Sequence, residues 1–444
     1  MFSPRPAQSS SWSSDKRAPS RGGYGGGWRP QSAQQRPPKD IMENLIARPV
    51  QSISSPSLAN VDRVEATDVK YLASYTWTNS RKPTMVVPGS PRVWRNLSLP
   101  YTVPADAGDT CAYSNAVKVP HSPILPLFLA VDTMEKDGSS EKFDWSSVDF
   151  ITDRNNLRKL LSWIEAKDNG RSVEDFRIDL KLCGVGTVLM QRWEAVVMYD
   201  SQRTGFGESF ERSSTRTGPD CEDGMLAGHN RIISYRFHGM KMVVRCEVDA
   251  CLLLDTASKA TPATASTSSR AAGSPSTHRK DLVAPSSADD LVDALATLNI
   301  TSGAAASSNE VDIVKGGVKV RQSALVKIKT RSSRNAETFD WTSAYLQLFL
   351  GQTYNLYLGI HQRGNFNEVR KIDFEAAEMK AAAEAAQPVL KKLGRLLDEI
   401  LYIVLEHGQE GRLSVVCRGG ELKMYQRKDE ETFIPDDILA RFGS

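Results

Sequence analysis

Two segments of the sequence place charged residues at alternate positions of a predicted strand. The segment CEVDAC carries Glu247 and Asp249, and the segment ALVKIKTR carries Lys327 and Lys329. Side chains two residues apart lie on the same face of a strand, so each pair shares a face. Two carboxylates on one face can bind a divalent cation together, because hard cations such as Mg²⁺ prefer carboxylate oxygens. A lysine nearby could orient an attacking water and offset the charge of a phosphate.

Each pattern also has a plainer interpretation. Glu247 and Asp249 could form ion pairs with Arg245 or Lys241 on their own strand, or with basic residues of a neighbouring strand. A strand with regularly spaced lysines could be a solvated edge of a sheet. An isolated E-x-D pattern is weak evidence for a metal site, so the rest of the sequence has to decide between these interpretations.

The elements that would position these residues alternate between strands and helices. Residues 240–254 carry apolar side chains at every second position, which predicts a strand with one face in the core. Spacing predicts these further elements: a helix over 152–165 that Thr152 or Asp153 could cap, two strands in 176–199 around a Gly184–Gly186 turn, a helix over 341–350, a strand over 354–361, a long helical region over 374–407 with a candidate break at Pro388, and a hairpin over 412–427 that turns at Gly419–Gly420. The alternation predicts an α/β (α+β) fold with mixed sheets.

Composition restricts the classes of protein that the chain could be. Its 444 residues are 40% hydrophobic and 25% charged, which is typical of a globular protein. The net charge of +3 means that any surface for nucleic acid must be local. No apolar run approaches the roughly 18 residues of a membrane span, and the N-terminus has no apolar signal segment. Six cysteines without a CxxC pair are typical of a reduced intracellular compartment.

Low-complexity segments divide the chain. Residues 1–45 are rich in Ser, Pro, Gly, Gln and Arg, and we expect a disordered tail there because such a segment cannot bury enough apolar surface. Residues 257–310 are rich in Ala, Ser and Thr, and we expect a disordered insertion. Residues 46–444 apart from this insertion are predicted to form a single domain.

The order of the motifs resembles that of the DXO-type decapping nucleases, which remove defective or non-canonical caps from RNA 5′ ends. That family carries, in order, the segments DFVTWRG, GYKFE, GEVDC, VELKTS and WWAQSFL. The matching segments here are VDFITDR with Arg154, TGFGESFE with Glu211, CEVDAC with Glu247 and Asp249, VKIKTR with Lys329, and AYLQLFL with Gln347. The resemblance is remote and covers about residues 46–444 without the insertion. Five motifs in one order are far more specific than any single motif.

The resemblance implies a fold with two mixed sheets flanked by helices around a metal-dependent nuclease-like core. It implies a hydrolase that acts on RNA 5′ ends, by removing incomplete or NAD-type caps or a 5′ pyrophosphate, with Mg²⁺ or Mn²⁺ as the cofactor. The implied roles are catalysis for Glu247, Asp249 and Lys329, substrate binding for Arg154, Glu211 and Gln347, and metal binding for Glu211, Glu247, Asp249 and the Ile328 carbonyl. The implied partners are an RNA 5′ end and a 5′→3′ exonuclease, and no membrane is involved. The implied location is the nucleus, with the cytoplasm as a second location, and the implied process is mRNA quality control.

Lys327 departs from the family pattern, which has a glutamate at this position. The chain therefore has three acids and two lysines where the family has four acids and one lysine. An ammonium group cannot ligate a metal, and it repels one strongly in a site of low dielectric. The sequence Glu421–Leu422–Lys423 has the expected E-x-K spacing, but it follows a Gly–Gly turn and no glutamine-bearing helix comes after it.

Three interpretations of Lys327 remain open. The protein could be an enzyme with one metal ion held by the three acids. Lys327 could instead turn away from the site or carry the charge of the scissile phosphate, which would leave weak activity. Finally, the fold could persist in a catalytically weakened or inactive member of the family that binds RNA or acts as a scaffold for a 5′→3′ exonuclease.

Overall fold

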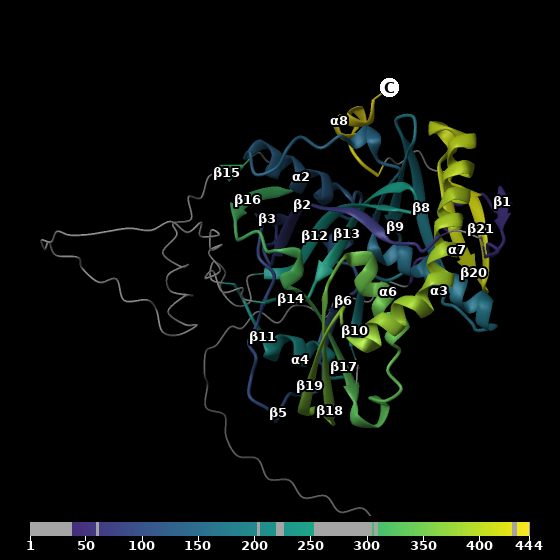
Figure 1. Cartoon of the computed structure of the whole chain (residues 1–444). Helices are drawn as coiled ribbons and strands as arrows, with labels where there is room; N and C mark the ends of the chain where they lie inside the picture. The colour runs from purple at the N-terminus through teal and green to yellow at the C-terminus, as the bar shows by residue number, and fades with distance from the viewer. Residues whose placement is uncertain are drawn as a thin grey trace, which may run out of the picture. The chain divides into compact units, whose positions relative to one another are not determined.

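Two mixed β-sheets and the helices that cover them make up most of the described chain (Figure 1). The structure is a computed structural model, and it describes residues 38–58, 62–201, 205–218, 226–252, 304–305, 310–428 and 433–443. The predicted α/β class with two mixed sheets flanked by helices is confirmed.

The larger sheet brings distant segments of the chain side by side. Its strands in spatial order are β1 (Gln51–Ile53), β21 (Glu421–Gln426), β20 (Leu413–Arg418), β8 (Phe176–Cys183), β9 (Thr187–Arg192), β7 (Phe150–Asp153), β13 (Met240–Val248), β12 (Leu226–Phe237), β2 (Ala66–Thr78), β3 (Thr84–Pro88), β16 (Asp312–Gly316) and β15 (Ala304–Ala305). Strand β7 pairs in parallel with both β9 and β13, and β16 pairs in parallel with β3. The strand that carries Glu247, β13, is therefore one of the three central parallel strands, with β7 and β9.

The smaller sheet contains the lysine-bearing strand. Its order is β11 (Thr215–Arg216), β4 (Val93–Trp94), β14 (Ala250–Cys251), β17 (Leu325–Ser332), β18 (Asn355–Gln362), β19 (Asn365–Asp373) and β5 (Tyr101–Thr102). Strands β17 and β18 are parallel, as are β14 and β4. A separate antiparallel pair joins β6 (Gly108–Cys111) to β10 (Met198–Ser201).

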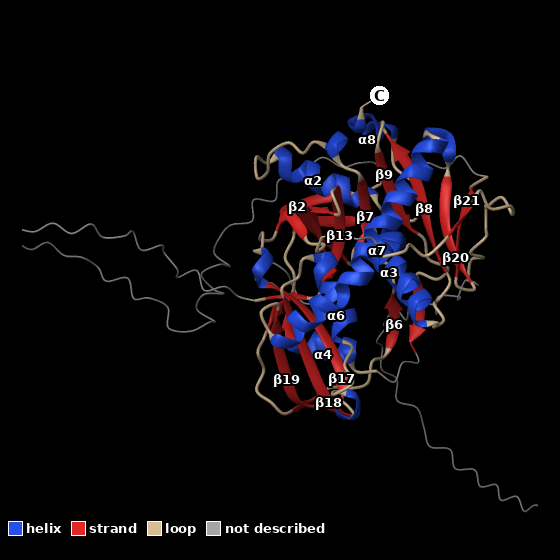
Figure 2. Cartoon of the chain, turned by 45° about the vertical axis from the view of Figure 1, so that its right-hand side comes forward, coloured by secondary structure: helices blue, strands red, loops and turns tan. Residues whose placement is uncertain are grey.

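Helices cover both faces of the larger sheet. The helices are α1 (Ser114–Lys118), α2 (Leu125–Lys136), α3 (Arg154–Asn169), α4 (Gly207–Ser214), α6 (Trp341–Gly351), α7 (Ala377–His407) and α8 (Asp436–Leu439). Helices α3, α6 and α7 pack together over one face (Figure 2), where they share a core with Met242 and Val244 of β13. Helices α2 and α8 contribute to the core on the other face, which contains Val243. None of the helices in the described part of the chain has the length and apolar character needed to cross a membrane.

The local elements predicted from spacing are largely confirmed. The predicted strands in 176–199 are β8 and β9, the predicted hairpin over 412–427 is β20 and β21, and the predicted helix over 341–350 is α6. The expected strand over 354–361 corresponds to β18. Helix α7 runs unbroken across Pro388, so the proposed break there is wrong.

Residues just before the predicted domain start at residue 46 pack against the larger sheet, and the predicted bounds stay a prediction. Leu45 is buried and bridges to Arg427. The side chain of Arg177 donates to the backbone carbonyls of Ile41 and Glu43, which ties this segment to β8. Apart from β15 and Glu310, the predicted insertion lies outside the described residues, as does the predicted tail up to residue 37.

A fully buried ion pair joins β7 to β13. The Arg245 guanidinium donates from Nε to Asp153 Oδ1 at 2.6 Å and from Nη2 to Asp153 Oδ2 at 2.9 Å. The hydroxyl of Tyr113 also donates to Asp153 Oδ2, and Arg245 Nη1 donates to the Pro123 carbonyl. Asp153 stands at the N-cap position of α3 as predicted, but its carboxylate is bonded to Arg245 and makes no capping hydrogen bond. Arg245 was also a candidate partner of Glu247, and it pairs with Asp153 instead.

Removing one partner of this pair should destabilise the fold strongly. Arg245→Met leaves the Asp153 carboxylate buried without its counter-charge, so we expect the free energy of unfolding to fall by about 3–5 kcal/mol. Urea denaturation followed by circular dichroism measures it. As a control, Lys380→Met removes a pair with Glu375 in which both side chains are exposed, and we expect a change below about 0.5 kcal/mol. Equal stability of the two variants would contradict the role of the buried pair.

Candidate functional site

The chain passes from the larger sheet to the smaller sheet at Asp249. Strand β13 ends at Val248, and after Asp249 the residues Ala250 and Cys251 form β14, which pairs with β17 of the smaller sheet. In this pairing Ala250 lies opposite Val326. Glu247 therefore lies at the end of the larger sheet, and Asp249 lies at the crossing, next to the lysine-bearing strand. The crossing brings the acidic segment and the basic segment together, as the order of motifs predicted.

Asp249 forms a buried ion pair with Lys327. Lys327 Nζ lies 2.7 Å from Asp249 Oδ1, and the backbone N–H of Ile328 donates to Asp249 Oδ2 at 2.8 Å. The Asp249 side chain is 6% exposed and that of Lys327 is 18% exposed. Lys327 therefore does not turn away from the site. Ile328 contacts Asp249 through its N–H group, whereas the family resemblance implies metal binding by its carbonyl.

Glu211 reaches this crossing from α4. Asp106 accepts hydrogen bonds from the N–H groups of Gly207 and Ser209 at the start of α4, which fixes the helix. The Cα of Gly207 faces Thr330 of β17, so α4 lies against the basic strand. Burial, together with the negative charges of Asp249 and Glu247, raises the pKa of Glu211 to about 8. Glu211 is therefore close enough to both acids to feel their charge.

Glu247 completes the acidic group. Surrounding protein groups and the charge of Asp249 raise its pKa, although Glu247 is itself exposed to solvent. Gly228 lies beside it, and a Cβ at that position would be 3.3 Å from Glu247 Oε1. Because Gly228 has a φ of +67°, a side chain there would also strain the backbone. A glycine at this position thus leaves room for the carboxylate.

Lys329 lies beside the same group without a direct partner. Burial and the positive charge of Lys327 lower its pKa to about 8, and Asp249 opposes this effect. No hydrogen bond or ion pair joins Lys329 to another described residue. Its ammonium group is therefore free to contact an anion.

Arg154 is largely buried without a bonded partner in the described chain, and Gln347 has a buried oxygen without one. Arg154, the first residue of α3, is 9% exposed and has no hydrogen bond or ion pair to any residue that the structure describes. It packs beside Gly351, where an added Cβ would lie 3.0 Å from Arg154 Nη1. Gln347 of α6 is 5% exposed, and its Oε1 has no partner among the described residues. An unsatisfied buried polar group costs about 1–3 kcal/mol, so the Gln347 oxygen is suited to meet a polar ligand. The Arg154 nitrogens are not among the buried unsatisfied atoms, so they stay accessible to an anion.

Sequence reasoning missed one arginine of this site, Arg158, which lies one helical turn after Arg154 on α3. Burial and the positive charge of Arg154 lower its pKa, and Arg192 adds to the effect. The i, i+4 spacing of two arginines on a predicted helix was the signal that could have found it. Arg154 and Arg158 therefore form a group of cations with Lys329, whose pKa both lower, and the motif comparison alone did not reveal Arg158.

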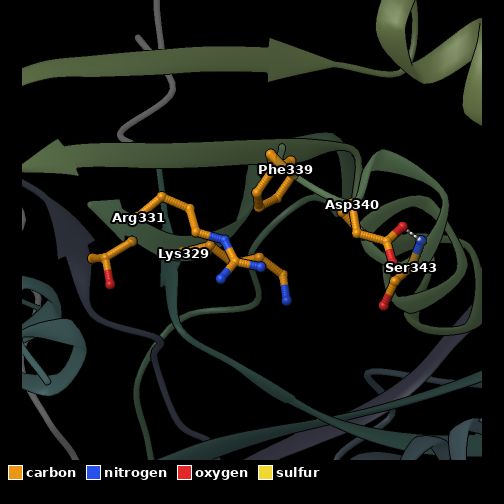
Figure 3. Close-up of a pocket in the computed structure, with 7 residues that line it drawn as sticks. Lys329, Arg331, Phe339, Asp340 and Ser343 are labelled. Carbon is orange, nitrogen blue, oxygen red and sulfur yellow. Dashed lines mark hydrogen bonds between the residues drawn. The ribbon is translucent and has the colours of Figure 1, made fainter. Parts of the chain in front are cut away.

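A pocket of about 170 Å³ continues from Lys329 toward the start of α6. It is lined by Lys329, Thr330, Arg331, Phe339, Asp340, Ser343 and Ala344. Figure 3 shows Lys329 and Arg331 on one side and Asp340 with Ser343 on the other. The Arg331 guanidinium lies over the Phe339 ring, 5.6 Å from its centroid, and Asp340 caps α6 by accepting from the Ser343 N–H. The pocket therefore presents two cations on one side and the Asp340 carboxylate at the start of α6 on the other.

The residues present do not fit a divalent cation in this arrangement. Both oxygens of Asp249 already accept hydrogen bonds, one of them from an ammonium group that would repel a metal. Within the described ranges, no three His, Cys, Asp or Glu side chains lie close enough together to hold a metal ion. The metal-binding roles of Glu211, Glu247, Asp249 and Ile328 stay predictions that this geometry does not favour. The other E-x-K, Glu421 and Lys423, lies in β21 near the opposite edge of the larger sheet, where the two residues pair with each other.

Solved structures share this fold over most of the chain. Rai1 of S. pombe aligns with a TM-score of 0.51 and 12% identity, covering 85% of this chain and 99% of that chain. Rai1 of Scheffersomyces stipitis, in complex with (3′-NADP)⁺ and calcium ion, aligns with a TM-score of 0.54 and 11% identity, covering 88% and 99%. Rai1 of Candida albicans, in complex with pU5 and Mn²⁺, aligns with a TM-score of 0.51 and 13% identity, covering 87% and 97%. The similarity confirms the predicted fold.

The sequence itself matches one family. The sequence model described as "Domain of unknown function (DUF8563)" matches residues 44–281 and 279–442. None of the curated protein sequences is significantly similar to the chain.

Two substitutions should move the pKa of Glu211 in opposite directions. Asp249→Asn removes a negative charge that raises this pKa, so we expect it to fall below about 8. Lys327→Met removes a positive charge that lowers it, so we expect it to rise. Titration of the side-chain carboxyl carbons by NMR measures both changes. The pKa of Glu399 on α7, which burial alone raises, should stay constant, and a Glu211 pKa unmoved by either substitution would contradict the proximity of these groups.

Proposed function

The chain belongs to the DUF8563 family, and we propose that it recognises the phosphorylated 5′ end of RNA at the junction of β13 and β17. The observation that carries the proposal is Arg154, a buried arginine without a protein partner, which lies in one electrostatic group with Lys329 and Arg158. A cation in a site of low dielectric interacts strongly with a phosphate, because water does not screen the charges.

The remaining polar groups extend this recognition. The free Oε1 of Gln347 can accept a hydrogen bond from a ribose hydroxyl or a base. Lys329 and Arg331 line one side of the pocket, opposite Asp340, and are suited to a second phosphate of the same strand. Two proteins with this fold have been solved with related molecules, (3′-NADP)⁺ in one and pU5 in the other, which supports the choice of ligand. From the family resemblance, the proposal also includes a nuclear location and a 5′→3′ exonuclease as partner.

A second candidate function is hydrolysis of RNA 5′ ends, namely decapping of incomplete or NAD-type caps or 5′ pyrophosphate removal. It is favoured by the mutual electrostatic influence of Glu211, Glu247 and Asp249. Lys329 would orient the attacking water beside these acids, and its pKa of about 8 allows it to exchange a proton near neutral pH. The donor set does not fit a divalent cation as arranged, so this function needs Lys327 to leave Asp249.

The recognition function predicts a requirement for the 5′ phosphate and for Arg154. Fluorescence anisotropy should show that the chain binds 5′-phosphorylated oligouridylate at least about 10-fold more tightly than 5′-hydroxyl oligouridylate, a difference of about 1.4 kcal/mol. Arg154→Met should weaken binding of the phosphorylated form by about 10- to 100-fold, because a hydrogen-bonded charge pair is lost. It should leave the stability of the fold nearly unchanged, since Arg154 has no protein partner.

Arg418→Met provides the matched control, because Arg418 is exposed on β20, far along the larger sheet from β13. Its affinity for the phosphorylated oligonucleotide should equal that of the unmodified chain. Equal affinity of the unmodified chain for the two oligonucleotides would contradict the proposed recognition of a 5′ phosphate.

Asp249→Ala separates the two functions. If the chain hydrolyses 5′ ends, this substitution abolishes Mn²⁺-dependent release of NAD from NAD-capped RNA, and retained release would contradict the assignment of the site. If the chain only recognises 5′ ends, the substitution removes a negative charge and frees Lys327, so we expect RNA binding to strengthen. Chromatography of the released nucleotide and a binding titration on the same preparation measure the two outcomes.

A further inference from the structure

We propose that the Lys327 ammonium is a built-in cation that replaces a metal ion at Asp249, so that the site binds a 5′ phosphate without a metal. The inference rests on the recognition function proposed above, and it is incompatible with metal-dependent hydrolysis. It concerns a substitution that distinguishes this chain from the family that its motifs resemble.

Both carboxylate oxygens of Asp249 already accept hydrogen bonds from protein groups. Lys327 Nζ approaches Oδ1 to 2.7 Å, and the Ile328 N–H approaches Oδ2 to 2.8 Å. Both carboxylate oxygens therefore have donors from consecutive residues of β17. The ion pair is shielded from water, since the Asp249 side chain is only 6% exposed. A metal could bind Asp249 only by displacing a buried ammonium group that has no other acid bonded to it in the described chain.

The positive charge of Lys327 also acts on the two acids beside Asp249. It opposes the rise in the pKa of Glu211 and of Glu247. The charge of Lys327 therefore acts on all three acids of the site. A divalent cation bound among the same acids would act in the same way. One ammonium group thus provides part of the neutralisation that the acids would otherwise require from a metal.

Three cations of the site are not paired with Asp249. Since Lys327 is paired with Asp249, the positive charges of Arg154, Arg158 and Lys329 are not consumed by that acid. The charges of Arg154 and Arg158 also act on Lys329, which favours an anion among these three cations. Their combined charge would neutralise a phosphate there without a bridging metal.

The direct test is titration of the full chain with Mn²⁺ alone, by isothermal calorimetry and by the electron paramagnetic resonance signal of free Mn²⁺. We expect no saturable site below millimolar Mn²⁺ in the unmodified chain. Lys327→Glu should create a site that binds at least 10-fold more tightly. Lys70→Glu changes an exposed lysine of β2 in the same way and should behave like the unmodified chain.

Thermal denaturation gives a second readout. Lys327→Glu places a fourth acid in the site, so the variant should be less stable without metal and should gain melting temperature when Mn²⁺ is added. The unmodified chain should show no such gain. If Lys327→Glu does not fold, Lys327→Gln removes the charge with a smaller change, and we expect it to bind Mn²⁺ more tightly than the unmodified chain.

RNA binding links the inference to the recognition function. Affinity of the unmodified chain for 5′-phosphorylated oligouridylate should change less than two-fold between EDTA and Mn²⁺, whereas that of Lys327→Glu should rise at least 10-fold with Mn²⁺. Micromolar Mn²⁺ binding by the unmodified chain, or loss of its RNA binding in EDTA, would overturn the inference. If the unmodified chain binds no 5′-phosphorylated RNA under any condition, the recognition function fails, and the titration with Mn²⁺ alone still decides the role of Lys327.

Discussion

The buried ion pair between Arg245 and Asp153 holds together the two strands that position the site. It lies between β13 and β7, with the guanidinium fully enclosed and bonded to both carboxylate oxygens. Asp153 immediately precedes Arg154, and Arg245 lies two residues before Glu247. One contact therefore sets the separation of the cation that would face a phosphate and the first acid of the site. A buried charge cannot lose its partner without a large cost, so this separation is maintained as long as the protein is folded.

At the crossing between the sheets, the balance of charge explains the arrangement better than metal ligation does. Asp249 is bonded by Lys327 and by the N–H of Ile328, and Glu211 and Glu247 beside it have pKa values raised by desolvation and by the charge of neighbouring acids. The cations farther out, Arg154 and Lys329, have no bonded acid among the described residues. The site thus sets a side-chain cation against the acid that a metal was expected to bind, and leaves two cations available to an anion.

Local patterns are sufficient to predict β13, β17 and α6, because strand alternation and helical spacing depend only on neighbours in the sequence. They do not predict the partner of Lys327, which is determined by the passage of the chain from one sheet to the other at Asp249. They also place Arg245 on a polar face, because the pattern cannot show that α2 and its neighbours cover that face. The burial of Arg154 likewise depends on α6 packing against α3. Tertiary contacts of this kind decide which charged residues are paired and which remain available for a ligand.

The central claim is that Lys327, rather than a metal, neutralises Asp249 when a 5′ phosphate is bound. The most direct measurement is a crystal structure of the chain grown with 5′-phosphorylated oligouridylate and Mn²⁺, with anomalous data collected at the manganese edge. We expect the phosphate beside Arg154 and Lys329, the Lys327–Asp249 ion pair intact, and no anomalous peak at the three acids. A manganese peak between Glu211, Glu247 and Asp249, with Lys327 displaced, would contradict the account.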